Sequence, residues 1–338
     1  MNTILLTGGS GFIGHWVARL LPPHLTLRIL ARPYSDLSLL DRANVRYERV
    51  TGDLLDPTSL LAALEGVEGV IHAAGYISFD RRRATQIRLA NLEATLNLFR
   101  ACGAQRVSRV VYTASIFALG HAKQGLVTRE SAFNAGALLD IPYVQAKREA
   151  ELAARDWMEQ GLPLVRVYPG LCLGPEDRTR SSSSTIGEWL RGRLPVLVEG
   201  GICYLDVRDA AAAHVAALLQ GEVGAQYLIP GYNLTHYQLF EQLAPLAGKQ
   251  LPWLTVPAPL AELGAGLLER LIDPPPLYRD MARLMRYRWW YDGQSSEAAL
   301  GIHYRPLEET LRVTLAELRD AATADKQKEA TQKPPLTE

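Results

Sequence analysis

The sequence predicts an α/β protein built on a doubly wound parallel sheet, with a smaller α/β lobe interleaved with it. Two observations predict this fold. Short apolar segments typical of buried strands alternate with amphipathic helical segments as far as about Tyr168, and a glycine-rich turn follows the first of these segments and opens a helix. Strands are expected at residues 3–7, 27–31, 45–51, 69–73, 109–113 and 164–168.

The helices between these strands have recognisable ends. The helix expected at 11–21 stops at Pro22-Pro23, and the helix expected at 58–64 begins after the turn-forming pair Asp56-Pro57. Both breaks fit a doubly wound fold, in which helices connect neighbouring parallel strands.

Beyond Pro169 the pattern is less regular, and sheet-like sequence returns near residues 204–207 and 226–229. We therefore expect a main domain of residues 1–170 plus about 203–230, and a smaller substrate lobe of residues 171–202 plus 231–320. Residues 321–338 are polar and charged, which predicts a disordered tail.

The apolar stretch 254–272 is broken by Pro257, Pro259 and charged residues, so it predicts a packed helix and not a membrane span. Lys plus Arg and Asp plus Glu number 36 each, which gives no reason to expect a nucleic acid or charged membrane as partner.

The three cysteines lie far apart, the histidines show no metal-ligand spacing, and the N-terminus enters a strand pattern at once. These features predict a cytoplasmic protein with no disulfide, no bound metal and no export signal.

The glycine-rich turn has the spacing GxxGxxG and stands between a strand and a helix. Glycines allow close approach of a ligand, and a helix N-terminus presents unpaired N–H groups to a pyrophosphate. A turn without a ligand is the alternative, but the context favours a dinucleotide site formed by Thr7, Gly8, Ser10, Gly11, Phe12, Ile13 and Gly14.

The residue at the end of the second strand bears on the choice of dinucleotide. An acidic residue there would hold the ribose 2′-hydroxyl of NAD, whereas Arg32 suits the 2′-phosphate of NADP, with Ser35 as a second donor. NADP(H) is therefore favoured over NAD(H). An arginine that merely ends a strand in solvent is the alternative.

Tyr143 and Lys147 form a YxxxK motif, whose spacing places a phenol and an ammonium on one face of a helix. A free tyrosine has a pKa of about 10, and a nearby cation lowers it, which would make the phenol a better proton carrier. Because YxxxK is common by chance, the prediction of a catalytic site depends on where the motif lies in the chain.

Together these segments resemble the extended branch of the short-chain dehydrogenase/reductase superfamily, in the NAD-dependent epimerase/dehydratase family. The glycine turn matches TGxxGFIG, and YxxxK follows a strand that leads to a hydroxyl residue, Ser115. The resemblance implies a Rossmann fold in which Ser115 donates to a substrate carbonyl and Tyr143 is the general acid or base. Tyr143 and Lys147 are also expected to bind the cofactor, with Lys147 holding its ribose.

The resemblance also implies further cofactor contacts. Asp53 and Leu54 match the turn that contacts adenine, and Ala73, Ala74 and Gly75 match the loop beneath the ribose. Pro169 and Gly170 match the loop over the nicotinamide, although a plain strand-ending turn explains them equally simply. Asn91 and Thr95 match NxxxT of the helix after the fourth strand, with ordinary polar helix positions as an even alternative.

Within this family the chain is most similar to the dihydroflavonol-reductase-like group. The group implies NADP(H)-dependent reduction of a hydrophobic ketone or aldehyde, or oxidation of the matching alcohol, and helix-mediated homodimers are usual in it. A nucleotide-sugar epimerase is an alternative, but Ile202 stands where that class carries an anion-binding arginine. A non-catalytic NADP sensor is another, although such proteins usually lose the tyrosine or the lysine.

Two basic segments have open interpretations. Residues 81–83, all arginine, are expected to form a solvated loop or a helix start, with the steering of an acidic substrate as the alternative. Residues 278–291 combine arginines with aromatic residues. This composition fits a membrane contact, closure of the substrate pocket, or a helix with a solvent-exposed basic face and a buried aromatic end.

Overall fold

The computed structural model describes residues 1–178 and 183–332, with side chains described as far as Asp320. Its main sheet has seven parallel strands in the order β10-β6-β5-β4-β1-β2-β3, which confirms the doubly wound α/β fold. The strands are β1 (Thr3–Thr7), β2 (Thr26–Ala31), β3 (Glu48–Thr51), β4 (Gly69–His72), β5 (Arg109–Thr113), β6 (Leu164–Pro169) and β10 (Gln226–Ile229).

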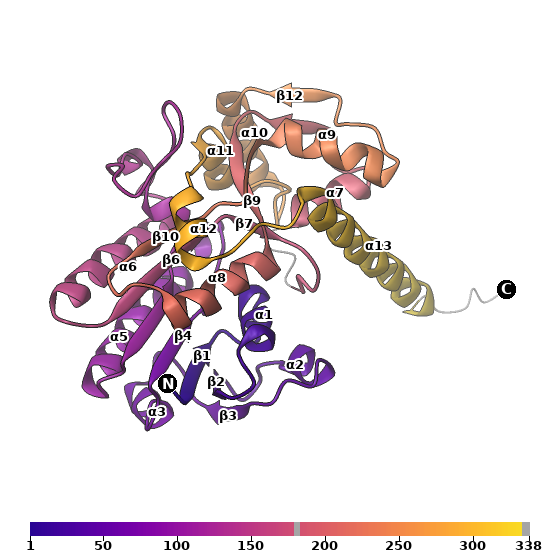
Figure 1. Ribbon diagram of the computed structural model, residues 1–338. Helices are drawn as coiled ribbons and strands as arrows, with labels where there is room; N and C mark the ends of the chain where they lie inside the picture. Colours follow the sequence, from indigo (N-terminus) through magenta and orange to yellow (C-terminus); the bar gives the residue numbers. More distant parts are fainter. Residues whose placement is uncertain (179–182, 333–338) are drawn as a thin grey trace.

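Helices cover both faces of this sheet (Figure 1). Side chains alternate along β1, so that Ile4 and Leu6 join the core under one helical layer while Leu5 joins the core under the other. The first layer is α1 (Phe12–Leu20) and α8 (Val207–Gln220), and the second is α3 (Pro57–Ala63), α5 (Ala94–Ala104) and α6 (Pro142–Glu159).

The chain runs from β1 outward to β2 and β3, and then returns to the other side of β1 through β4, β5 and β6. The strand order therefore reverses between β1 and β4. In open parallel sheets a ligand crevice forms at such a reversal, outside the carboxyl ends of the strands.

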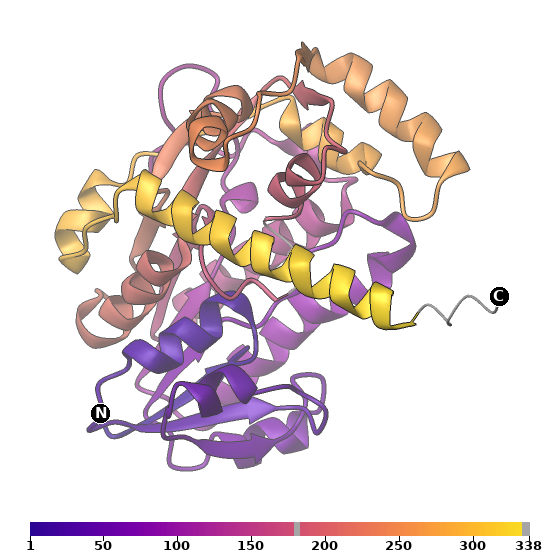
Figure 2. The same cartoon turned by 90° about the vertical axis from the view of Figure 1, so that its right-hand side faces the viewer.

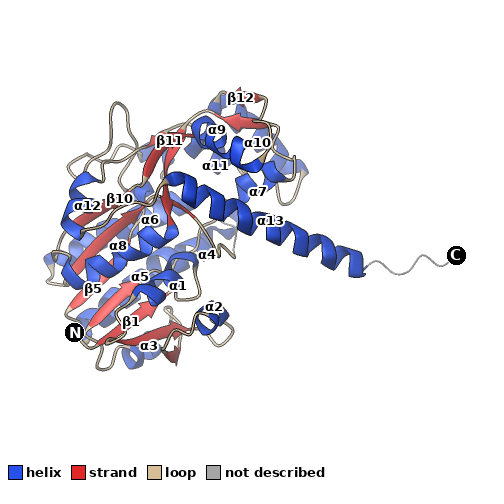
Figure 3. Ribbon diagram, turned by 45° about the vertical axis from the view of Figure 1, so that its right-hand side comes forward, coloured by secondary structure: helices blue, strands red, loops and turns tan. Residues whose placement is uncertain are grey.

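The smaller lobe lies at one end of the molecule (Figure 3). Its sheet has the order β11-β9-β13, with β7 paired to β9 on a separate branch, and β8 pairs with β12. The strands are β7 (Leu171–Leu173), β8 (Val196–Val198), β9 (Gly201–Asp206), β11 (Tyr232–Thr235), β12 (Leu254–Val256) and β13 (Arg288–Trp289), and the helices include α7 (Ser184–Leu190), α9 (His236–Ala247), α10 (Ala258–Leu271) and α11 (Arg279–Met285).

Residues 203–206 lie in this smaller sheet, contrary to the domain boundary expected from the sequence. They belong to β9, which pairs with β11, β13 and β7, and only the following helix α8 and strand β10 return to the main domain. Every residue of β9 is buried, and a continuous apolar strand carries no signal that says which sheet it joins.

The structure also differs from the expectation for the C-terminal region. The region expected to be a disordered tail continues the helix α13 (Leu307–Gln332) as far as Gln332, because residues 321–332 are rich in good helix formers; residues 333–338 lie outside the described part. Figure 2 shows α13 running across the face of the molecule toward the C-terminus. The stretch 254–272 is a short strand followed by α10, which packs against α11 as expected, although most of the leucines of α10 are exposed.

Candidate active site

The glycine turn lies at the carboxyl end of β1, immediately before α1. Gly8 has a φ of 75°, and a Cβ built on it would lie 2.6 Å from the carbonyl carbon of Ala73. A Cβ on Gly14 would lie 2.0 Å from the Gly8 oxygen, so α1 can approach the turn this closely only with glycine there. The N-cap, Gly11, provides no side-chain cap to the first N–H groups of α1. The turn therefore fits a pyrophosphate.

The end of β2 presents a guanidinium at the same edge of the sheet. Arg32 is exposed, its guanidinium lies 5.0 Å from the ring centre of Tyr34, and it has no ion-pair partner among the described residues. Ser35 closes a turn by donating its backbone N–H to the Arg32 oxygen at 2.9 Å, and Arg49 donates to the carbonyls of Arg32 and Pro33, also at 2.9 Å. This loop could hold a 2′-phosphate.

The remaining residues expected at the cofactor follow β3 and β4. Asp53 and Leu54 lie just beyond β3, where the Asp53 carboxylate accepts from the Leu55 N–H at 2.9 Å. Ala73 and Ala74 donate their N–H groups to the backbone oxygen and the hydroxyl of Thr7, at 3.2 and 3.4 Å. The parallel order of the strands places all of these segments at one edge of the sheet.

The three predicted catalytic residues meet at this edge. Ser115 follows β5 and is the N-cap of a short 3₁₀ helix (Ile116–Ala118), while Tyr143 and Lys147 lie in the first turns of α6. All three are buried, and the Ser115 hydroxyl is close enough to the Tyr143 phenol to lower its pKa. A Cβ on Gly75 would lie 3.7 Å from the Lys147 ammonium, so that ammonium faces the loop after β4.

Burial shifts the pKa values of the two titrating groups in opposite directions. It raises the pKa of Tyr143 to about 12, against the lowering effect of the Ser115 hydroxyl, and it lowers the pKa of Lys147 to about 8. The expected lowering of the tyrosine pKa by the lysine is not found. Lys147 has no hydrogen-bond or ion-pair partner in the described part of the chain, so its ammonium is free to hold ribose hydroxyls.

A hydrogen-bonded chain behind the glycine turn was not assigned from the sequence. The two ring nitrogens of His72 hydrogen-bond the Thr7 hydroxyl at 2.7 Å and the Thr95 hydroxyl at 3.0 Å. The Thr95 hydroxyl also donates to the backbone oxygen of Asn91. Burial lowers the pKa of His72 to about 3, so its ring is neutral. Asn91 bonds both backbone groups of Tyr76 from a π-helical segment (Leu89–Glu93). The hydrogen bonds of Asn91 and Thr95 thus stabilise the structure next to the predicted site. π-helical segments are frequent at functional sites.

Aromatic side chains surround the phenol of Tyr143. Phe79 and Phe117 each meet the Tyr143 ring edge-on, with ring centres 6.0 and 6.1 Å away, and Trp289 meets Phe117 at 4.6 Å. Tyr291 donates its hydroxyl to the Ile116 oxygen at 2.9 Å. The segment 278–291 therefore places buried aromatic residues against the predicted catalytic loop. The buried aromatic end and the closure of the substrate pocket were among the interpretations left open for this segment, but its contact with Phe117 was not predicted.

The other singled-out residues have structural partners. Gly170 follows β6, and its N–H donates to the Ile229 oxygen at 2.9 Å. Ile202 is buried in the apolar core of the smaller lobe. The three arginines at 81–83 form a 3₁₀ turn at a helix start, and they bond acidic residues and a tyrosine of both lobes, namely Asp80, Asp140, Asp273, Asp280 and Tyr76.

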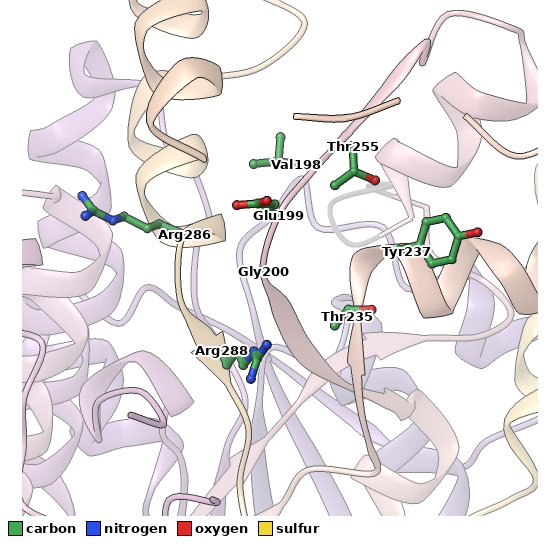
Figure 4. Close-up of a pocket in the computed structure, with 8 residues that line it drawn as sticks. All are labelled: Val198, Glu199, Gly200, Thr235, Tyr237, Thr255, Arg286 and Arg288. Carbon is green, nitrogen blue, oxygen red and sulfur yellow. The ribbon is translucent and has the colours of Figure 1, made fainter. Parts of the chain in front are cut away.

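A cavity of about 430 Å³ lies in the smaller lobe and contains none of the predicted site residues (Figure 4). Glu199, Arg286, Arg288 and Tyr237 are among its lining residues. The Arg286 side chain points away from Tyr237 and the two threonines of the wall, so the polar groups do not converge on a common point. The predicted site lies elsewhere, at the edge of the main sheet.

The fold and the arrangement at the sheet edge are those of a nicotinamide-dependent enzyme of the short-chain dehydrogenase/reductase type. The model of the NAD dependent epimerase/dehydratase family matches residues 4–229, and the chain belongs to this family. The family expected from the sequence is therefore confirmed, and relatives named as dihydroflavonol 4-reductase and cinnamoyl-CoA reductase confirm the expected group.

The relatives have different names. The chain is 31% identical to "Sterol demethylase protein B" of Methylococcus capsulatus over 79% of this chain and 81% of that protein. It is 31% identical to "2-alkyl-3-oxoalkanoate reductase" of Stenotrophomonas maltophilia over 91% of this chain and 97% of that protein. The crystal structure of gox2253 superposes with a TM-score of 0.82 at 27% identity, over 95% of this chain and 99% of that one. The family thus includes reductases, epimerases and dehydratases.

Proposed function

We propose that this protein is an NADP(H)-dependent oxidoreductase that reduces a hydrophobic ketone or aldehyde, or oxidises the matching alcohol. The observation that carries the proposal is the meeting of Ser115, Tyr143 and the unpaired ammonium of Lys147 beside the glycine turn. When bound, the nicotinamide supplies or accepts the hydride.

Ser115 and Tyr143 bind the substrate oxygen, and Tyr143 exchanges a proton with it. The hydroxyls of Ser115 and Tyr143 donate hydrogen bonds to the carbonyl oxygen and so polarise it. Tyr143 then gives its proton to that oxygen as the alcohol forms, and takes a proton from the alcohol in the reverse direction. Its pKa of about 12 keeps the phenol protonated at neutral pH, as a general acid requires. The phenolate that remains takes a proton back from solvent, and the Lys147 ammonium holds the ribose of the cofactor.

Two observations favour a reductase over a nucleotide-sugar epimerase. Ile202, which stands where the epimerases carry an anion-binding arginine, is a buried apolar residue of the core. Phe79 and Phe117 flank the phenol and offer an apolar surface to the substrate. A hydrophobic carbonyl compound fits such an apolar surface better than a charged diphosphate does.

The Tyr143→Phe variant tests the reaction. It should lower kcat by at least about a hundredfold on a panel of hydrophobic ketones, because it removes the transferable proton, while NADPH fluorescence titration shows unchanged binding. Nearly full turnover with cofactor bound would overturn the assignment. Interconversion of UDP-sugars without net consumption of NADPH would identify an epimerase, and NADPH binding without turnover of any substrate would identify a sensor.

The Arg32→Ala variant tests the cofactor preference. Loss of a charge-assisted contact to the 2′-phosphate should weaken NADPH binding by about tenfold or more and leave NADH binding unchanged. Arg46→Ala is the matched control, because Arg46 is an exposed arginine just before β3. Equal affinities of the Arg32→Ala variant and the wild-type protein for NADPH would refute the preference.

A further inference from the structure

The outer face of α10 is an exposed aliphatic stripe. Leu260, Leu263, Leu267 and Leu271 are 59%, 73%, 58% and 72% exposed, and they recur at intervals of three or four residues, so they form one line along the helix. Soluble proteins seldom expose a contiguous set of large apolar side chains without a function for it. Figure 2 shows α10, in orange, at the upper right margin of the molecule.

The opposite face of α10 packs on the protein. Ala258 and Ala265 are buried there, and α10 lies against α11. Glu262 is 3.0 Å from the Arg279 guanidinium, and Glu269 accepts from the Arg279 N–H at 2.6 Å. Both carboxylates of the helix are therefore bonded to α11 and turn away from the stripe.

A basic residue of α10 lies next to the stripe. Arg270 stands one residue before Leu271, is exposed, and has no ion-pair partner among the described residues. Trp253 lies just before β12 and is 82% exposed. An aliphatic stripe with an arginine beside it is the composition of helices that lie in a lipid interface, and the exposed carboxylates of Glu269 and Asp273 are bonded to Arg279 and Arg82.

A second copy of the chain is a poorer occupant for this face. A stable protein interface buries about 800 Å² on each partner and makes about one hydrogen bond for each 100–200 Å². The stripe is the width of one short helix, and its leucines and the intervening Gly264 offer no side-chain hydrogen-bonding group. A lipid surface needs neither hydrogen bonds nor a complementary shape.

We propose that α10 docks the protein on a lipid surface, with the helix lying in the plane of the membrane and the leucine stripe inserted between the acyl chains. Among the described residues no helix is both long and apolar enough to cross a bilayer. The binding does not depend on the proposed function, but it would deepen it.

The position of α10 links this surface to the predicted catalytic residues. α10 packs on α11, and β13 follows α11 and carries Trp289, which contacts Phe117 beside Tyr143. An apolar carbonyl compound dissolved in the membrane would thus meet the protein on the lobe that flanks the phenol.

Vesicle flotation of the full chain tests the proposal. The probes are vesicles of phosphatidylcholine alone and vesicles containing one third phosphatidylglycerol. The wild-type protein should float with both, more strongly with the second because of Arg270. The double variant Leu263→Glu, Leu267→Glu should bind at least about tenfold more weakly, because two charged side chains replace inserted leucines. Leu219→Glu, a change at a leucine that is 49% exposed on α8, should float like the wild type.

The possible results distinguish a lipid surface from a second copy of the chain as the partner of the leucine stripe. Absence of flotation by the wild type overturns the proposal, and so does equal flotation of the wild-type and double-variant proteins. Sedimentation velocity that shows a dimer lost only in the double variant assigns the stripe to a second copy instead. Reduction of a water-soluble ketone is measured in parallel and should be the same in all three proteins, so failure of the proposed function is seen separately from failure to bind vesicles.

Discussion

Replacing Lys147 by methionine should stabilise the cofactor-free protein while it removes function. Among the described residues the buried ammonium has no hydrogen-bond or ion-pair partner, only the ring of Tyr112 with its centre 5.8 Å away, and its pKa is lowered from 10.5 to about 8. At about 1.4 kcal/mol for each pKa unit, this difference corresponds to about 3 kcal/mol of lost stability when the lysine is charged. Methionine fills a similar volume without a charge, so Lys147→Met should raise the free energy of unfolding at pH 7 by about 3 kcal/mol.

The pH dependence follows from the direction of the pKa shift. The unfolded chain keeps the lysine proton up to about pH 10.5, whereas the folded protein releases it near pH 8. The stability of the wild type therefore rises between pH 8 and pH 10.5 relative to that of Lys147→Met. The difference of about 3 kcal/mol at pH 7 should shrink to about 1 kcal/mol at pH 10.

Urea unfolding of the cofactor-free proteins at pH 7 and pH 10 measures this difference. Lys249→Met is the control, because Lys249 is exposed and its replacement should change neither value. A stability difference that does not vary with pH, or a Lys147→Met protein less stable than the wild type at pH 7, would refute the reasoning. In NADPH titrations the same variant should bind more weakly than the wild type, since no ammonium remains to hold the ribose.

Three further predictions concern the framework of the site. Gly14→Ala should abolish NADPH binding or soluble expression, because its Cβ would lie 2.0 Å from the Gly8 oxygen, whereas Gly264→Ala, with no neighbour within 4 Å, should be tolerated in both assays. Glu151→Gln should lower the free energy of unfolding by about 3 kcal/mol, because it removes the carboxylate that lies 2.8 Å from the buried Arg166 guanidinium. Urea unfolding measures this change, and an unchanged midpoint would contradict the prediction. Burial lowers the pKa values of His72, His214 and His236 to about 3 or 4, so these rings stay neutral in the folded protein at a pH where the unfolded chain binds protons. The free energy of unfolding should therefore fall by several kcal/mol from pH 6.5 to pH 4.5, and a free energy that does not change over this range would contradict the prediction.

Much of the site could be predicted because its parts are local motifs. The turn from Thr7 to Gly14 needs glycine for a positive φ and for close approach of α1, and such requirements are visible in the residues themselves. The spacing of Tyr143 and Lys147 places both on one face of any helix. The alternation of strands and helices then implies that these motifs meet at one edge of a parallel sheet.

Other features of the site depend on contacts that no local pattern reports. Trp289 reaches Phe117 from a distant part of the chain, and His72 bonds Thr95 only because β4 and α5 are adjacent. The pKa of Tyr143 is raised by burial, whereas the motif alone suggested a lowered value. Each of these depends on what surrounds a side chain in three dimensions.

The sequence by itself determined the doubly wound sheet, the glycine turn and the pair of Tyr143 and Lys147, because strand and helix periodicities and glycine requirements act over a few residues. Only the tertiary structure decided that β9 joins the smaller sheet and that the leucines of α10 face outward. An apolar residue favours burial against any apolar neighbour. Which neighbour it finds, or whether it finds one, is decided by the packing of elements far apart in the chain.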